Sequence, residues 1–410
     1  MTARLLVRDL AQLATPAGSV APLRGAALRE VEVTRAAYVL CEDGRVVATG
    51  RMSELQHLGD DVEEIDARGL SAIPGLVDCH THACFAGDRV EEFSFRAGGA
   101  SYEELHARGG GILSTVRATR EAGDAALAAA LAEHVGWMLR AGTTTFEAKS
   151  GYGLDRETEL AQLRAVRDAG GIPTWLGAHT VPPEFAEQGA DAYVDFLLAE
   201  VLPDAATIAE AADVFLERGA FDADQARRYL TACRDAGLVL RLHGDQFTES
   251  GAVPLAIELG ARSVDHLEAT GPDGVSELAR SDVVGVLLPA SALFLNRPMP
   301  PARALVDAGA AIALATDFNP GSAFCESLPL VCSLAATQMS LAPEEALAAC
   351  TVNAAHVLGR AERKGRIAPG FDADIVLVAA EDWRHVAYHL GGPVVHTVIA
   401  HGKVAWRGSA

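Results

Sequence analysis

From residue 72 onward, the sequence alternates short apolar runs rich in β-branched residues with longer stretches of helical periodicity. One helical stretch, 155–170, places Leu160, Leu163 and Val166 on one face and ends at Gly170. The apolar runs number eight, at residues 75–82, 143–150, 174–180, 212–217, 239–245, 262–267, 283–289 and 312–318. Eight strand and helix alternations predict an α/β fold, a (β/α)8 TIM-like barrel, although a doubly wound open sheet has the same one-dimensional pattern.

The two ends of the chain have a different character, with short strands and turns in place of helical stretches. The segment 396–408 is typical of a hairpin that turns at His401 and Gly402. We therefore expect a small β domain formed by both termini, residues 1–68 and 363–410, beside a barrel domain of residues 69–362. The connection 83–142 is too long for an ordinary loop of a βα unit, so we expect it to carry function.

Charge and cysteine content exclude several classes of partner. The chain has 34 basic and 55 acidic residues, a formal net charge of −21, which disfavours nucleic acid and anionic membrane surfaces as partners. Its seven cysteines are scattered without a CxxC pair, so neither a disulfide framework nor a thiolate zinc site is indicated. With no long apolar segment, we expect a protein of the reducing cytoplasm that is not exported.

Polar residues gather where the predicted strands end. The carboxyl ends of the strands form the active-site face of a βα barrel, so polar residues there are informative. Five of the thirteen histidines lie at such ends. The polar residues at strand ends are His80, His82, Glu147, Lys149, His179, His243, Asp265, His266 and Asp317.

The spacing of His80 and His82 indicates a metal site. Residues at i and i+2 of a strand lie on the same face, so both imidazoles can bind one ion if that face is the barrel interior. His243 and Asp317 would complete a set of three nitrogens and one oxygen, which suits Zn²⁺ or Fe²⁺ and leaves a position for water. The alternative is a pair of core histidines; the further histidine and aspartate at strand ends favour the metal.

These residues also resemble a known family. The segments "PGLVDCHTH" at the first strand and "ATDFNPGS" at the eighth, with the single histidine of the fifth, resemble the amidohydrolase superfamily. Within it the chain is similar to the imidazolonepropionase family, and "KSGYGL", "GAHTVPPE" and "TDFNPGS" are the more specific motifs. The similar segments are 85–105, 109–122, 147–160, 177–185 and 313–322.

The resemblance implies a fold, a reaction and a cofactor. The fold is a metal-containing (β/α)8 barrel with a small β-sandwich built from both termini. The reaction is hydrolytic ring opening of the small-molecule substrate 4-imidazolone-5-propanoate to N-formimidoyl-L-glutamate in histidine degradation. The cofactor is one divalent metal ion, Zn²⁺ or Fe²⁺, with Fe³⁺ also possible. A cytoplasmic homodimer is the family's expectation.

Family roles transfer to matching positions of this sequence. The implied metal ligands are His80, His82, His243 and Asp317. The implied substrate contacts are Arg89, Tyr152, His179, Gln246, Asn319, Gly321 and Ser322. Two positions depart from the family pattern: Cys79 stands where relatives often have proline, and Gln246 where some have glutamate. Because an amide cannot take up a proton at neutral pH, a mechanism with residue 246 as general base is in doubt here.

The reaction itself assigns the catalytic residues. A bound divalent metal can activate water and polarise the carbonyl. We expect Asp317 to take the proton of the water and deliver it to the ring nitrogen as the C–N bond breaks. His266 is expected to polarise the carbonyl, or alternatively only to orient Asp317.

A propanoate substrate requires a cation in this acidic protein. Arg89, seven residues after His82, could bind the carboxylate through paired hydrogen bonds, although a lone loop arginine is usually a solvated surface residue. Tyr152 lies between glycines that allow close backbone approach, and its phenol could donate a hydrogen bond; a packed turn tyrosine is the alternative.

Two further features could suggest other chemistry. Some amidohydrolases carry a carboxylated lysine that bridges two metals, but the position of Lys149 on the second strand predicts one metal and an unmodified lysine. The segment "RGGGI", 108–112, lacks a following GK[ST], so we expect a lid element and not a phosphate-binding loop.

Competing hypotheses come from within and outside the superfamily. A cytosine or guanine deaminase, or an N-acyl-amino-acid deacylase, would share the metal ligands but would not need an arginine and tyrosine for a propanoate. A catalytically inactive scaffold that works by assembly would be expected to lack metal ligands, and all are present here.

Overall fold

The central part of the chain, from Leu76 to Leu314, forms a barrel of parallel strands. The fold is described from a computed structural model, for residues 4–58, 61–99 and 111–408. Each of the eight apolar runs overlaps one strand, and neighbours along the chain pair in parallel in the order β13 to β6. The strands are β6 (Leu76–Asp78), β7 (Thr143–Lys149), β8 (Ile172–Ala178), β9 (Ala211–Leu216), β10 (Val239–Gly244), β11 (Ser263–His266), β12 (Val284–Leu287) and β13 (Ile312–Leu314).

The first and last strands meet beyond their own ends. The N–H of Asp317 donates to the carbonyl of His80 at 3.0 Å, and the N–H of His82 donates to the carbonyl of Phe318 at 2.9 Å. Thr81 and Phe318 form a parallel bridge there. This contact closes the ring at the carboxyl face, so the barrel is confirmed and the open sheet is excluded.

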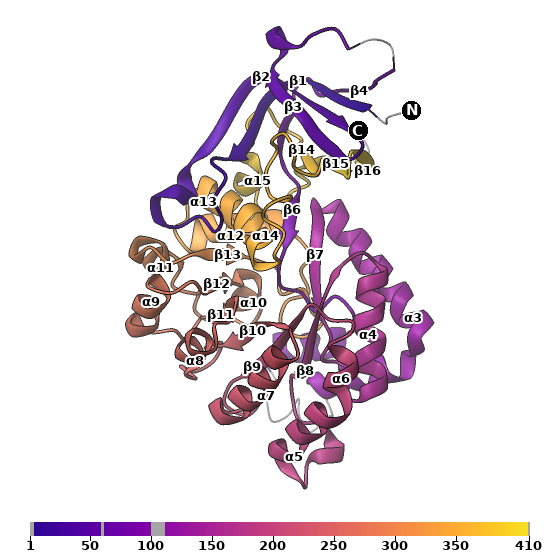
Figure 1. Ribbon diagram of the computed structural model, residues 1–410, viewed down its shortest axis with the longest axis vertical. Coiled ribbons are helices and arrows are strands. Elements are labelled where there is room, and N and C mark those ends of the chain that lie inside the picture. Colours follow the sequence, from indigo (N-terminus) through magenta and orange to yellow (C-terminus); the bar gives the residue numbers. More distant parts are fainter. Residues whose placement is uncertain (1–3, 59–60, 100–110, 409–410) are drawn as a thin grey trace.

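Helices surround the barrel (Figure 1). In α4 (Arg156–Asp168), the Asp155 carboxylate accepts the N–H of Thr158, and the predicted apolar face is buried. The other helices are α1 (Val90–Ala97), α3 (Ile112–Arg140), α5 (Gly189–Phe196), α6 (Leu202–Ala205), α7 (Ala223–Asp235), α8 (Ala252–Leu259), α9 (Pro272–Ala279), α10 (Pro289–Phe294), α11 (Ala302–Ala308), α12 (Leu328–Gln338), α13 (Pro343–Ala348), α14 (Ala354–Val357) and α15 (His385–Tyr388). Short 3-10 helices are η1 (Gly25–Arg29), η2 (Met52–Glu54) and η3 (Pro183–Phe185); η4 (Leu197–Val201) and η5 (Ala349–Asn353) are π-helical turns.

Both termini build a second sheet at one end of the molecule (Figure 1). Its hydrogen-bonded order is β16-β15-β14-β5-β1-β2-β3, with β4 paired to β1. The predicted hairpin turns at His401 and Gly402, whose φ angles of 48° and 71° suit a tight two-residue turn. The strands are β1 (Arg4–Pro16), β2 (Val31–Glu42), β3 (Arg45–Arg51), β4 (Glu63–Asp66), β5 (Ser71–Pro74), β14 (Ile375–Val378), β15 (Val395–Ala400) and β16 (Lys403–Arg407).

The chain passes from this sheet into the barrel at Gly75. Strand β5 pairs with both β1 and β14, and β6 begins at Leu76. A Cβ atom at residue 75 would lie 2.2 Å from the Oγ1 of Thr144, so only glycine fits this crossing. The exact domain limits 1–68, 69–362 and 363–410 stay a prediction.

Two sequence expectations concern other parts of the chain. All seven cysteines are free, as their spacing suggested. Among the residues that the structure describes, no helix combines the length and apolarity needed to cross a membrane. The predicted lid element spans residues 108–112. Residues 108–110 lie outside the described part of the chain, and Gly111 directly precedes α3.

Candidate metal centre and substrate pocket

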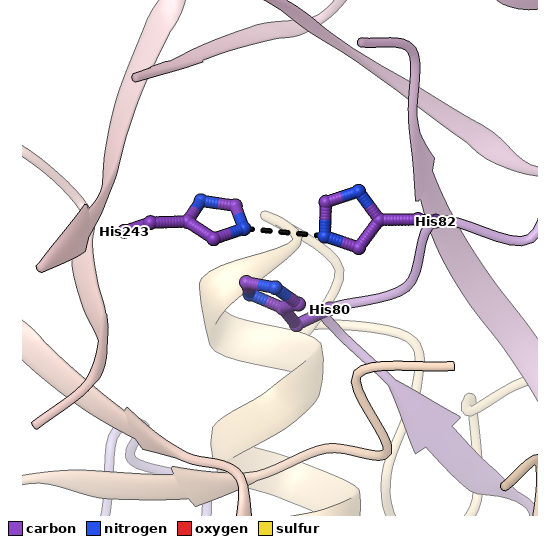
Figure 2. Close-up of side chains that lie close together, drawn as sticks. All are labelled: His80, His82 and His243. Carbon is purple, nitrogen blue, oxygen red and sulfur yellow. Dashed lines mark hydrogen bonds between the residues drawn. The ribbon is translucent and has the colours of Figure 1, made fainter. Parts of the chain in front are cut away.

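The four predicted metal ligands converge at the carboxyl face of the barrel. Figure 2 shows the imidazoles of His80, His82 and His243 turned toward one another, with 3.2 Å between the Nε2 atoms of His82 and His243. Asp317 Oδ1 lies 3.6 Å from His80 Nε2 and 3.5 Å from His82 Nε2. All four side chains are buried, so their ligand atoms face a shared space from which bulk water is excluded.

Two buried carboxylates set the orientation of the imidazoles. Asp265 Oδ2 lies 2.6 Å from His80 Nδ1, and Asp213 Oδ1 lies 3.0 Å from His243 Nδ1. A carboxylate accepts the proton at Nδ1, which leaves the Nε2 lone pair directed into the cluster. Burial, followed by the charge of Lys149, keeps the pKa of His80 well below its usual value, which favours the neutral form that binds metals.

The donor set fits a cation. A proton shared between His82 and His243 would satisfy that pair alone. It would leave His80 Nε2, a buried atom without a hydrogen-bond partner among the described residues, facing Asp317 at 3.6 Å. One ion bound by three imidazole nitrogens and a carboxylate oxygen would satisfy all four groups, and this donor set is suitable for Zn²⁺ or Fe²⁺.

His266 joins the cluster on the side of Asp317. Its ring nitrogens and those of His80 lie close enough to an Asp317 oxygen to form a second possible ligand group. Its Nδ1 lies 3.4 Å from Glu268 Oε1, a partner that sequence inspection did not identify. His266 and Asp317 both have positive φ angles, 84° and 56°, which are strained for these residue types and common at functional sites.

Lys149 lies below the metal ligands as part of a buried charge network. Its Nζ is 2.8 Å from Glu147 Oε1 and 3.0 Å from Asp213 Oδ2. Burial opposes its charge, but Glu147 and Asp213 raise its pKa above the usual value, so it remains a cation. Glu147 also accepts the N–H of Thr81 at 3.1 Å, between the two histidines of the HxH motif. This arrangement fits an unmodified lysine that positions ligands.

Tyr152 and His179 lie beside the metal cluster, as predicted. The His179 ring stacks on His82 at 5.3 Å between centroids, and the Tyr152 ring lies 5.8 Å from that of His82. His179 Nδ1 lies 2.9 Å from the carbonyl oxygen of Gly151, to which it donates. Burial lowers the pKa of His179 to about 3, so its ring is neutral.

Arg89 is held in place by a residue that the sequence did not reveal. Its Nε and Nη2 donate to Glu92 at 2.9 and 2.5 Å, while a Cβ atom at residue 321 would lie 1.9 Å from its Nη1. Glu92 Oε2 also accepts the N–H of Gly111 at 2.8 Å. Gly321 therefore makes room for the guanidinium, and Nη1 is the part of Arg89 that Glu92 leaves free for another partner.

The loop after Asp317 is fixed by its own side chains. Asn319 Nδ2 donates to the carbonyl of Asp317 at 2.6 Å, and its Oδ1 accepts the N–H groups of Gly321 and Ser322 at 2.8 and 2.7 Å. Ser322 Oγ lies 3.4 Å from Asp317 Oδ2. Gln246 is buried just beyond β10, in a loop whose Phe247 N–H donates to Glu217. Loop 319–322 is thus built around Asp317.

Several of these partners carried only a weak sequence signal. Asp213 is a charged residue within the apolar strand β9, and such a residue on a buried strand indicates a polar partner inside the barrel. Glu92 follows Arg89 at a spacing of three residues, which brings the two side chains together on a helix. Neither residue's position in the sequence identifies its partner, because the contact depends on how the barrel strands are aligned.

A ring of parallel strands with a buried cluster of histidines and an aspartate at its carboxyl face defines a class of metal-dependent hydrolases. The model of the family described as "Amidohydrolase family" matches residues 71–405 of this chain. Over 97% of both chains, the sequence is 58% identical to an imidazolonepropionase of Rubrobacter xylanophilus. It is 46% identical to that of Chloroflexus aggregans, over 98% of both chains. The chain belongs to the amidohydrolase family and, within it, to the imidazolonepropionases.

A solved structure of lower sequence identity supports the fold. Guanine deaminase of E. coli superposes with a TM-score of 0.68 over 99% of both chains at 13% identity. At this identity the likeness concerns the fold alone, so it gives no support to a deaminase activity.

Proposed function

We propose that this chain hydrolyses 4-imidazolone-5-propanoate to N-formimidoyl-L-glutamate, a ring opening in histidine degradation. The observation that carries the proposal is that Arg89 contacts Gly321, in the loop that follows the metal ligand Asp317. The charges of Arg89 and Asp317 both act on Tyr152, whose pKa is raised chiefly by burial. A cation for the propanoate thus lies beside the metal cluster, which a deaminase of uncharged bases would not require.

The proposed cofactor is one divalent ion held by His80, His82, His243 and Asp317. The donor set suits both Zn²⁺ and Fe²⁺, and Fe³⁺ is a third option. When bound, such an ion lowers the pKa of a water molecule and polarises a carbonyl.

The proton is proposed to move through Asp317. Its Oδ1 faces the histidines and its Oδ2 lies toward Ser322. Oδ2 would take the proton from the attacking water and deliver it to the ring nitrogen when the C–N bond breaks. Glu268 engages His266 at Nδ1, so the other ring nitrogen of His266 would polarise the carbonyl or orient Asp317.

The substrate contacts are proposed from the pocket lining. Arg89 Nη1 would bind the propanoate carboxylate by a charge-assisted hydrogen bond. Gln246 would bind the ring as a hydrogen-bonding partner only, since its amide takes up no proton. The remaining proposed contacts are Tyr152, His179, Asn319, Gly321 and Ser322.

The decisive experiment follows the ultraviolet absorbance of 4-imidazolone-5-propanoate with metal-loaded protein and identifies N-formimidoyl-L-glutamate as the product. Cytosine and guanine are tested in parallel. Loss of the absorbance with formation of that product is the expected result. No turnover of the imidazolone, with deamination of either base, would move the assignment to the deaminases. We further propose that the protein is a cytoplasmic homodimer. Sedimentation of the purified protein tests whether it is a dimer.

A further inference from the structure

Glu159 is a buried carboxylate that the metal centre does not use. Glu159 lies in the first turn of α4 and is fully buried. Its Oε1 accepts the backbone N–H groups of Gly151, Gly153 and Leu154 at 3.0, 2.9 and 2.9 Å. Three backbone donors at one oxygen offset part of the cost of burying the carboxylate, although burial still raises the pKa of Glu159 above its usual value.

The loop that Glu159 holds carries Tyr152. Gly151 has a φ angle of 99°, which glycine adopts readily, whereas Leu154 has a φ angle of 56°, a left-handed conformation that is unfavourable for leucine without support from its surroundings. A Cβ atom at Gly153 would lie 2.6 Å from the backbone nitrogen of Glu159, which shows how closely the loop contacts α4. The loop conformation therefore depends on this contact with the helix.

The same loop also holds His179. The carbonyl of Gly151 accepts from His179 Nδ1 at 2.9 Å, while its N–H donates to Glu159. Through its N–H and its carbonyl, Gly151 thus connects α4, the Tyr152 loop and the end of β8. Both rings reach the metal cluster through this connection, at 5.8 Å from His82 for Tyr152 and 5.3 Å for His179.

We propose that Glu159 is a positioning residue for substrate binding, which acts by holding the 150–154 loop so that the Tyr152 phenol faces the substrate. The proposal rests on the proposed function for the identity of the substrate. Replacing the carboxylate by a neutral amide weakens the hydrogen bonds from these three buried N–H groups, so the loop is held less firmly. The metal ligands lie on other elements, so metal binding is unaffected.

Glu159→Gln is the test variant, because its amide keeps the size of the side chain but removes the charge and turns the oxygen that lies 3.2 Å from the Gly151 nitrogen into a donor. We expect KM for 4-imidazolone-5-propanoate to rise about 10-fold, kcat to change less than about threefold, and metal content to stay the same. The matched control is Glu157→Gln on the same helix, whose side chain is 80% exposed; its KM should equal that of the wild type.

A double-mutant cycle tests whether Glu159 acts through Tyr152. Tyr152→Phe should raise KM, and adding Glu159→Gln to it should raise KM little further, because the phenol that the loop positions is already gone. An additive rise in the double variant, or an unchanged KM in folded Glu159→Gln, would overturn the proposal. If Glu159→Gln does not fold, Glu159→Asp takes its place in both measurements, since it keeps the charge but shortens the reach.

A readout independent of catalysis separates this proposal from the proposed function. Hydrogen exchange of the amides at 151–154 should be faster in Glu159→Gln than in the wild type, and unchanged in Glu157→Gln. Equal exchange rates in all three proteins would refute the loop's dependence on Glu159. Absence of imidazolone turnover by the wild type, with accelerated exchange in the variant, would refute the proposed function and leave the loop support standing.

Discussion

Arg89 illustrates how a loop arginine can be fixed in an orientation suited to binding a carboxylate. By itself its position in the sequence is compatible with a solvated side chain. In the structure its side chain is only 14% exposed, paired with Glu92 through two of its nitrogens. A guanidinium fixed in this way loses little further conformational freedom when it binds a carboxylate.

We predict that Arg89→Ala raises KM for the propanoate substrate by about 10- to 100-fold, the range expected for a hydrogen bond between charged groups. Metal content, measured by elemental analysis, should not change. Arg35→Ala, at an exposed position of β2, is the control with the same loss of charge. An unchanged KM in Arg89→Ala would remove Arg89 from the substrate pocket.

The partner of Arg89 gives a second, related prediction. In Arg89→Ala the Glu92 carboxylate keeps the Gly111 N–H but loses its cation, so it repels the substrate's carboxylate. Arg89→Ala/Glu92→Gln should therefore have a lower KM than Arg89→Ala alone, as steady-state kinetics can measure. A double variant that binds substrate more weakly than the single one would contradict this account.

At the residue scale, the sequence placed the predicted ligands and Asp265 at strand ends but did not reveal the roles of Asp213 and Glu159. His80, His82 and Asp317 stand at strand ends, a local property that spacing reveals. Asp213 and Glu159 act through partners that only the barrel's register or the path of a loop brings near. Asp213 lies thirty positions before His243, and Glu159 meets the Tyr152 loop across a turn of irregular backbone. Such contacts are not encoded in a residue's own neighbourhood.

At the element scale, the first and eighth predicted strands are longer than the observed ones. Residues 79–82 and 315–318 were expected to continue the first and eighth strands, yet β6 ends at Asp78 and β13 at Leu314. These two extensions pair with one another through the isolated parallel bridge between Thr81 and Phe318, which lies outside the regular strands. The alternation that places His80 and His82 on one side is preserved, and the closure of the barrel itself positions three of the ligands.

Helix α13 supplies a pH-dependent element far from the metal ligands. The buried Glu345 carboxylate accepts the N–H of Ala342 at 2.7 Å and pairs with Arg29 and Arg303 at 2.9 and 3.0 Å. Burial opposes its charge, but the N–H of Ala342 and the two guanidinium groups together hold its pKa below the ordinary value of 4.5.

A carboxylate with a lowered pKa stabilises the fold above its ordinary pKa, and the contribution is lost as pH falls through the folded-state value. We predict that Glu345→Gln melts lower than the wild type at pH 7, by on the order of 2 °C, and that the difference shrinks as pH falls below 4.5 and through the lower folded-state pKa. Thermal unfolding followed by circular dichroism between pH 3 and 7.5 measures this, with the adjacent Glu344→Gln as control. A difference that is constant over this range would show that the charge of Glu345 is not its cause.

At the scale of the whole molecule, the barrel and the terminal sheet differ in how far the sequence could predict them. The barrel follows from eight local alternations, each visible in the periodicity of its own segment. The terminal sheet depends on β5, which lies between β1 and β14 and so joins strands about 360 residues apart in the chain. No local pattern specifies such a pairing, which is why the existence of a terminal domain was predictable and its strand order was not.

The barrel interior has an excess of acidic groups that a dication offsets. Glu147, Asp213, Asp265 and Asp317 are buried around the histidines, against the two buried cations Lys149 and Arg241. Without an ion, these carboxylates repel one another in a medium of low polarity. A metal that binds only the folded state therefore contributes to the stability of the entire barrel.

We accordingly predict that removal of the metal with a chelator lowers the melting temperature of the whole protein, since a ligand present at about 1,000 times its Kd stabilises by about 4 kcal/mol. Re-addition of Zn²⁺ or Fe²⁺ should restore it, with one equivalent bound per chain by elemental analysis. In Asp317→Asn, which removes a ligand charge, the chelator should lower the melting temperature much less. In Glu157→Gln, at an exposed position of α4, the chelator should lower it as much as in the wild type. Two equivalents per chain would contradict the single site and would point to His80, His266 and Asp317 as a second ligand group.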